Sequence, residues 1–66
     1  MNVKIAQRLA ELRRARGYSQ ESLARELGLS RQAVSKWENG TAAPSTTNLM
    51  AMAKLFGVEA AELLKE

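Results

Sequence analysis

The stretch that decides the fold reads SQESLARELGLSRQAVSKWENG and covers residues 19–40. Its first part, about residues 20–27, is rich in good helix formers and begins after Ser19, a residue type that caps helix N-termini. Gly28 follows where a left-handed backbone is needed to end that helix. A second helix, over about residues 31–38, begins after Ser30 and ends at Asn39-Gly40. The stretch therefore predicts two short helices joined by a tight turn.

Three apolar positions in this stretch fit two helices that cross closely. Ala24 is small enough to let a second helix approach, and Val34 and Trp37 lie about one turn apart, where they anchor the second helix to a core. We interpret Trp37 as a core residue rather than one that stacks on a nucleic-acid base. A helix, a short turn containing Gly and a second helix form a helix-turn-helix motif, which is the structural prediction for this stretch.

The outer face of the second helix is polar and rich in long hydrogen-bonding side chains. At about 100° per residue, one arc of roughly 140° collects the polar side chains and the opposite arc is apolar. The polar residues are Arg31, Gln32, Ser35, Lys36 and Asn39. Arg and Lys match the edge of guanine, Gln matches adenine and Ser suits either, so this face fits DNA. An ordinary solvated face is the alternative, but such faces usually include Glu, which this arc lacks.

Glu38 is expected at the border of the apolar arc, where a carboxylate needs a partner. Arg13, in the first predicted helix, is the candidate for that partner. The sequence therefore predicts a partly buried ion pair that connects the first and third helices, and an exposed Glu38 is the alternative.

The remainder of the chain also predicts helices, so the expected fold class is all-α. Apolar residues at i, i+4 and i+7 from Ile5 share one face of the first helix. The helices outside the central stretch are predicted over about residues 3–16, 46–56 and 59–65. No linker divides the chain, so residues 1–66 are predicted to form one compact five-helix domain.

Composition excludes several classes of function. The 66 residues include no His and no Cys, so the usual catalytic bases, thiol nucleophiles and zinc ligands are missing. We therefore expect no enzyme activity, no metal, no cofactor and no small-molecule ligand.

The sequence has neither a signal peptide nor an apolar segment long enough to span a bilayer, which predicts a soluble cytoplasmic protein with no membrane partner. The net charge of +3 comes from an excess of Lys and Arg before Gly40 and favours a polyanionic partner.

The chain resembles the lambda-repressor-like family of helix-turn-helix DNA-binding domains, which includes XRE-type and phage Cro proteins. The resemblance covers about residues 5–64 and is carried by LAELRRARGYSQESLARELGLSRQAVSKWENG, a following Pro-Ser, and LMAMAKLFGVEAAELL. It implies five helices, with the third in the DNA major groove. It also implies a transcriptional regulator, most often a repressor, that binds a palindromic operator in double-stranded DNA as a homodimer.

The resemblance also implies roles for individual residues. The family's base-reading positions match Arg31, Gln32, Ser35 and Lys36. Its phosphate-contacting positions match Ser19, Gln20 and Asn39, and the N-terminus of a helix at Gln20 also favours an anion. Its interhelical salt bridge matches Arg13 and Glu38, the pair expected above from the helix angles.

Three features depart from the family pattern. Residues 41–43 lack the Lys or Arg that many relatives carry, so fewer phosphate contacts are expected. The last helix begins with Glu-Ala instead of a Ser cap, so its start is expected to fray. Ser22 stands where a Glu would complete a capping box with Ser19, so that box is expected to be incomplete.

The last two predicted helices carry more apolar residues than one chain buries with ease. These residues are Leu49, Met50, Phe56, Val58, Leu63 and Leu64. They are consistent with a dimer patch or with completion of the core. A protein-interaction module, such as an antitoxin or a bridging protein, is the alternative function on the same fold.

Overall fold

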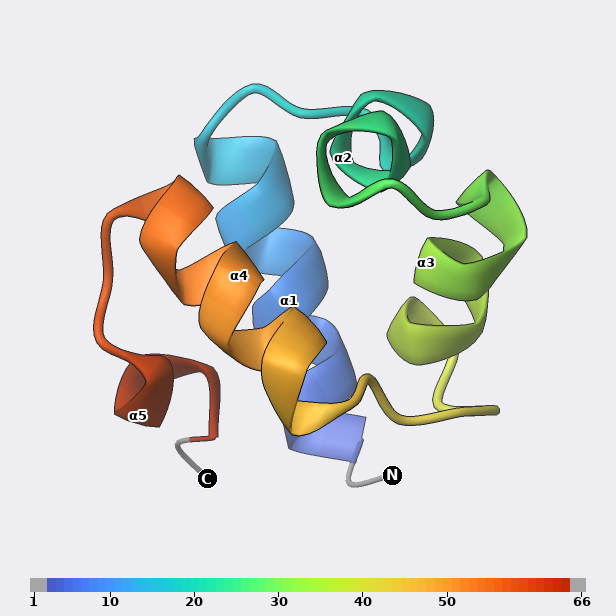
Figure 1. Cartoon of the computed structure of the whole chain (residues 1–66). Coiled ribbons are helices and arrows are strands. Elements are labelled where there is room, and N and C mark those ends of the chain that lie inside the picture. Colours follow the sequence, from blue (N-terminus) through green and yellow to red (C-terminus); the bar gives the residue numbers. More distant parts are fainter. Residues whose placement is uncertain (1–2, 65–66) are drawn as a thin grey trace.

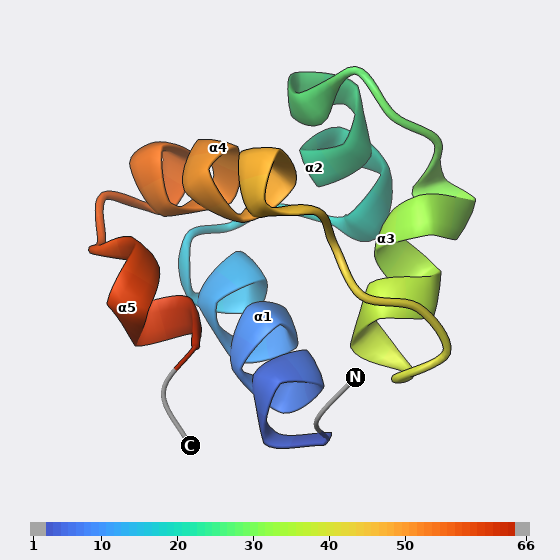
Figure 2. The same cartoon turned by 60° about the horizontal axis from the view of Figure 1, so that its bottom comes forward.

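The computed structural model describes residues 3–64, which form five α-helices. They are α1 (Val3–Ala15), α2 (Gln20–Leu27), α3 (Arg31–Glu38), α4 (Thr46–Phe56) and α5 (Ala60–Leu63). Figure 1 shows α2 and α3 on one side of α1 and α4, and α5 on the other side. The turned view of Figure 2 keeps this arrangement, so α3 and α5 lie on opposite sides of the molecule. The predicted all-α fold is confirmed.

Three helices cover the ranges expected from the sequence, and the first and last are shorter. α1 ends at Ala15, one residue before the expected end. α5 runs from Ala60 to Leu63 instead of over residues 59–65, of which Lys65 lies outside the described residues. Glu59 occupies the N-cap position of α5 but makes no side-chain hydrogen bond to the helix, so the first turn lacks the support that Ser gives α2, α3 and α4.

Two glycines end helices in the same way. Gly28 ends α2 with a φ of 70°, and Gly57 ends α4 with a φ of 72°. The next residue then bonds back to the helix: Leu29 N–H donates to the Ala24 carbonyl at 2.8 Å. This arrangement satisfies carbonyls that the helix leaves free and reverses the chain toward the following helix. The turn between α2 and α3 is therefore fixed by backbone geometry.

The N-terminus of α2 carries a complete capping box, so the expectation of an incomplete one is wrong. The Ser22 backbone N–H donates to Ser19 Oγ at 2.9 Å, and the Ser19 backbone N–H donates to Ser22 Oγ at 2.8 Å. The second bond is the one that Glu ordinarily makes. A serine hydroxyl reaches the same donor here because the side chain of Ser22 folds against its own turn.

The helices enclose one apolar core. Its buried members are Leu9, Leu23, Ala24, Val34, Trp37, Met52, Ala53, Phe56 and Leu63. Trp37 is 5% exposed, which confirms its interpretation as a core residue. Among the apolar residues of the last two helices, Phe56 and Leu63 complete the core and Leu49 and Val58 pack against it. Met50 and Leu64 remain 61% and 50% exposed and therefore belong to the surface.

Candidate nucleic-acid interface

The outward face of α3 carries the residues predicted to read bases. Arg31, Gln32 and Lys36 are exposed, and Ser35 is partly exposed. Within residues 3–64, none of these four side chains makes a hydrogen bond or an ion pair. Their donors and acceptors are thus free for an external partner.

The opposite face of α3 holds the helix in place. Val34 and Trp37 are buried in the core, and Ser30 Oγ accepts a hydrogen bond from the Ala33 backbone N–H at 3.3 Å. The helix therefore has a fixed rotation about its own axis. That rotation turns its polar arc to solvent.

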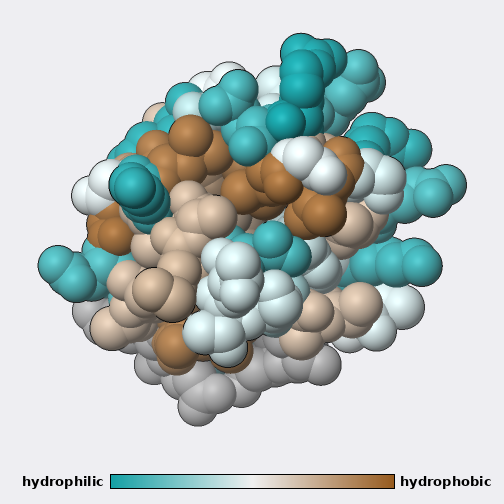
Figure 3. All heavy atoms as spheres, viewed as in Figure 1, coloured by the Kyte–Doolittle hydropathy of each residue, from teal (hydrophilic) through white to brown (hydrophobic). Residues whose placement is uncertain are grey.

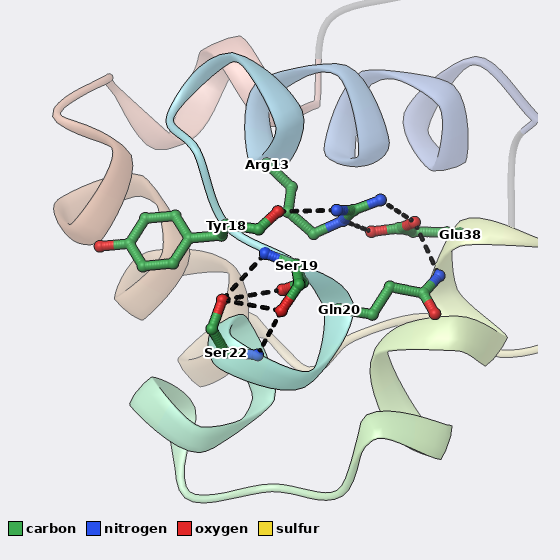
Figure 4. A network of polar contacts seen from close by, with 6 residues as sticks. All are labelled: Arg13, Tyr18, Ser19, Gln20, Ser22 and Glu38. Carbon is green, nitrogen blue, oxygen red and sulfur yellow. Dashed lines mark hydrogen bonds and ion pairs between the residues drawn. The ribbon is translucent and has the colours of Figure 1, made fainter.

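The C-terminal end of α3 is attached to α1 by the predicted ion pair. Arg13 Nε donates to Glu38 Oε2 at 2.6 Å, and Arg13 Nη2 donates to Glu38 Oε1 at 3.1 Å (Figure 4). The two side chains are only 10% and 7% exposed. Arg13 Nη1 also donates to the Tyr18 carbonyl at 2.7 Å, so the guanidinium fixes the turn before α2 as well. In this pair the charges of Arg13 and Glu38 neutralise each other, and the contact sets the position of α3 against α1.

The residues predicted to contact DNA phosphates all make hydrogen bonds inside the protein. Ser19 Oγ takes part in the capping box, where it also lies 3.1 Å from Ser22 Oγ. Gln20 Nε2 donates to Glu38 Oε1 at 3.0 Å. Asn39 Oδ1 accepts from the Thr41 backbone N–H at 2.9 Å, which leaves the Asn39 amide nitrogen without a partner among residues 3–64. The orientations of these side chains are therefore set before any ligand binds.

The loop after α3 is closed by its own hydrogen bonds. The Lys36 carbonyl accepts from the backbone N–H groups of both Thr41 and Ala42, at 3.0 and 3.2 Å. These two N–H groups are therefore already used, and the loop carries no basic side chain.

Two contacts near this site have no clear signal in the sequence. Arg16 Nε donates to the carbonyl of Phe56 at 2.8 Å, which connects the turn after α1 to the end of α4. The ring of Tyr18 also lies against the ring of Phe56, with centroids 6.1 Å apart. Both contacts stabilise the turn that leads into α2. Sequence patterns do not reveal them, because one acceptor is a main-chain carbonyl and the other contact depends on how the turn before α2 packs against the end of α4.

The surface divides by polarity. Figure 3 shows hydrophobic residues over the middle of the face formed by α4, and hydrophilic side chains projecting on the side of α3.

Residues 3–64 contain no helix that is both long and apolar enough to cross a membrane. In the same part of the chain, no pocket and no group of three potential metal ligands is found.

Known proteins are similar to this chain in sequence and in fold. Residues 9–63 match the helix-turn-helix family model. The HTH-type transcriptional activator BcrR of Enterococcus faecalis is 41% identical over 58 residues, which make up 88% of this chain. The chain spans only 28% of the length of BcrR.

Several solved structures have a similar fold. The restriction-modification controller protein C.AhdI of Aeromonas hydrophila has a TM-score of 0.84 and 44% identity, with 92% of each chain covered. The P22 c2 repressor in complex with a synthetic operator has a TM-score of 0.84 and 30% identity, again with 92% of each chain covered. Hydroxypropylphosphonic acid epoxidase of S. wedmorenis also contains the fold, at 27% identity, but only 32% of that chain is covered. The chain belongs to the lambda-repressor-like helix-turn-helix family.

Proposed function

We propose that this chain is a sequence-specific regulator of transcription that places α3 in the major groove of double-stranded DNA. The observation that carries the proposal is that the polar side chains on the outward face of α3 have no hydrogen-bond or ion-pair partner within residues 3–64. Arg31, Gln32 and Lys36 are exposed and have no partner within residues 3–64, whereas the opposite face of the helix seals the core. The major groove admits an α-helix, and Arg, Lys and Gln are the side chains that match guanine and adenine there. Ser35 completes the proposed base-reading set.

Charge supports the same partner. Arg31 and Lys36 give α3 two cations, and its one carboxylate, Glu38, is already paired with Arg13. The helix therefore presents a positive face. We propose that Ser19, Gln20 and Asn39 contact phosphates at its edges. Asn39 is well suited to this role, because its acceptor is bonded to the loop and its amide donors are free.

The proposed assembly is a homodimer formed through Met50 of α4 and Leu64 of α5, here called the α4–α5 patch. Both side chains are at least half exposed although they are apolar. The chain measures 26 × 25 × 21 Å, and α3 lies on the side opposite α5 (Figures 1 and 2). Two copies joined through this patch hold their α3 helices farther apart than one chain width. Successive major grooves on one face of DNA are about 34 Å apart, which such a spacing can meet.

We propose that the chain regulates transcription by occupying an operator. A dimer across two half-sites covers DNA that a polymerase needs, so we assign the chain the role of a repressor without enzyme activity. The P22 c2 repressor is a related protein whose named role agrees with this assignment. BcrR, which is named an activator, is one whose role differs.

Selection of bound duplexes from a random pool tests the proposal directly. The expected result is one motif with two related half-sites whose centres lie about 10 base pairs apart. Binding to the selected duplex should weaken steeply with salt, because each phosphate contact contributes a slope of about −0.9 to log K against log salt. Failure to enrich any sequence, together with a flat salt plot, contradicts DNA binding. A stable complex with a protein that survives high salt points instead to the interaction-module alternative.

A further inference from the structure

The Glu38 carboxylate is shared by two side chains with different tasks. Oε2 accepts from Arg13 Nε, and Oε1 accepts from both Arg13 Nη2 and Gln20 Nε2, at 3.1 and 3.0 Å (Figure 4). Arg13 comes from α1, Gln20 is the first residue of α2, and Glu38 is the last residue of α3. Within residues 3–64, the bond from Gln20 to Glu38 is the one side-chain hydrogen bond between α2 and α3. It therefore joins the start of α2 to the end of α3, the two helix ends that lie away from the connecting turn.

A carboxylate partner determines which end of the Gln20 amide faces inward. An ionised carboxylate only accepts hydrogen bonds, whereas an amide has one accepting oxygen and two donor hydrogens on nitrogen. The nitrogen of Gln20 must therefore face Glu38, and a rotated amide would bring its oxygen against Oε1. One Nε2 hydrogen is used by Glu38, and the second is left for another acceptor.

The ion pair makes this arrangement compatible with a nearby phosphate. A lone carboxylate at the edge of a DNA-binding face would repel the DNA backbone. Arg13 cancels the charge of Glu38 through two hydrogen bonds, so the carboxylate orients Gln20 without adding net negative charge. Glu38 itself is 7% exposed in its side chain and lies behind Gln20 rather than at the surface.

We propose that Glu38 is a positioning residue for DNA binding, which holds the Gln20 amide so that its second Nε2 hydrogen is donated to a backbone phosphate. The inference rests on the proposed function and assigns a geometry to one of its phosphate contacts. Because Glu38 ends α3, the same carboxylate keeps that phosphate contact in register with the base-reading face. DNA thus meets a preset donor, with no side chain to reorient on binding.

The decisive measurement is NMR of the wild-type protein, free and bound to the duplex selected from the random pool. We expect a coupling through the hydrogen bond between Gln20 Nε2 and the Glu38 carboxyl carbon in both states. Loss of the coupling on binding, with the amide released from Glu38, overturns the proposal. This test needs no variant and therefore does not depend on whether a substituted protein folds.

A double-mutant cycle tests the effect on affinity, measured well below the melting temperature of every variant. Gln20→Ala should weaken binding to the selected duplex roughly tenfold, as expected for a hydrogen bond to a charged group. Glu38→Gln should weaken it severalfold when Gln20 is present and less than twofold when Gln20→Ala is present as well. Equal losses in both backgrounds mean that Glu38 acts only through the fold, which overturns the proposal.

The matched control is Glu21→Gln. It makes the same chemical change and the same change in net charge one residue from Gln20, but the Glu21 side chain is 70% exposed and, within residues 3–64, its ion pair is with Arg25. Removal of a negative charge should by itself favour DNA binding, so Glu21→Gln should not lower affinity. An equal loss in the control contradicts a role specific to Glu38. A wild-type protein that selects no duplex refutes the proposed function instead, whereas additive losses on a selected duplex refute only the positioning role.

Discussion

Arg16 Nε donates a hydrogen bond to the Phe56 carbonyl at 2.8 Å, across 40 positions of sequence. Phe56 is the last residue of α4, and its carbonyl is one that the helix itself leaves without a partner. A cation at this end of a helix also interacts favourably with the helix dipole. The turn after α1 thus closes the C-terminus of α4 and holds the two helices together beside the core.

Arg16→Ala should lower the free energy of unfolding by about 1 kcal/mol, because it removes this hydrogen bond from a partly buried position. Urea denaturation measures the change. Arg14→Ala is the control, since Arg14 is exposed and makes no such contact within residues 3–64. Equal stability of the two variants would show that the bond to Phe56 contributes nothing.

Glu38→Ala should destabilise the domain far more, by about 3 kcal/mol, because it leaves the buried Arg13 without its charge partner. For a domain of this size the melting temperature should fall by roughly 12–24 °C. The exposed pair of Glu21 and Arg25, at 3.3 Å, provides the comparison, and Glu21→Ala should change stability by less than about 0.5 kcal/mol. A Glu38→Ala melting temperature equal to that of wild type is the contrary result.

Arg31→Ala should cost about 1–3 kcal/mol of affinity for the selected duplex and relax the base preference at one position of each half-site. The fold should be unaffected, because Arg31 is exposed and unbonded within residues 3–64. Selection from a random pool with the variant checks the motif. Arg25→Ala, an exposed arginine on α2, should leave the motif unchanged. An unaltered motif for Arg31→Ala argues against base reading by this residue.

Gly28→Ala should cost about 1–2 kcal/mol of stability for backbone reasons alone. Gly28 has a φ of +70°, and a Cβ added there meets no atom within 4 Å. Steric contact therefore contributes nothing to the expected loss. Gly28→Asn should cost less, because Asn adopts this left-handed conformation more readily. Thermal melts of the two variants test the order, and an equal loss for Ala and Asn speaks against the backbone explanation.

Leu64→Glu should weaken the proposed dimer without unfolding the chain, because Leu64 is 50% exposed in the single chain. Sedimentation equilibrium in the absence of DNA measures the assembly. Leu29→Glu introduces the same charge at another exposed leucine, in the turn between α2 and α3, and should leave assembly unchanged. If both variants assemble as wild type does, the α4–α5 patch is not the dimer contact.

Local signals explain why much of the fold can be predicted from the sequence. α2, α3 and α4 each begin after a serine whose hydroxyl caps the helix, and the ends of α2 and α4 are marked by glycine. Helical periodicity likewise predicts the exposed arc of α3, because the buried Val34 and Trp37 fix the opposite side. The partner of Glu38 is predictable for the same reason, since a carboxylate at the edge of an apolar arc requires a nearby cation.

The contacts that escape prediction depend on how elements meet in space. The acceptor of Arg16 is a main-chain carbonyl, a group that every residue carries, so sequence gives no means of choosing Phe56. The bond from Gln20 to Glu38 exists because the packing of the two helices brings the start of α2 next to the end of α3. Ser22 completes a capping box because its short side chain is placed by the turn itself, which residue type alone does not show.

The buried guanidinium of Arg13 also sets which substitutions position 13 tolerates. All three of its nitrogen atoms are used: Nε and Nη2 by Glu38, and Nη1 by the Tyr18 carbonyl. A lysine carries the same charge on a single nitrogen and cannot reproduce this planar fork. Position 13 therefore requires the planar shape of arginine as well as its charge, and Arg13→Lys should destabilise the domain even though it preserves the charge.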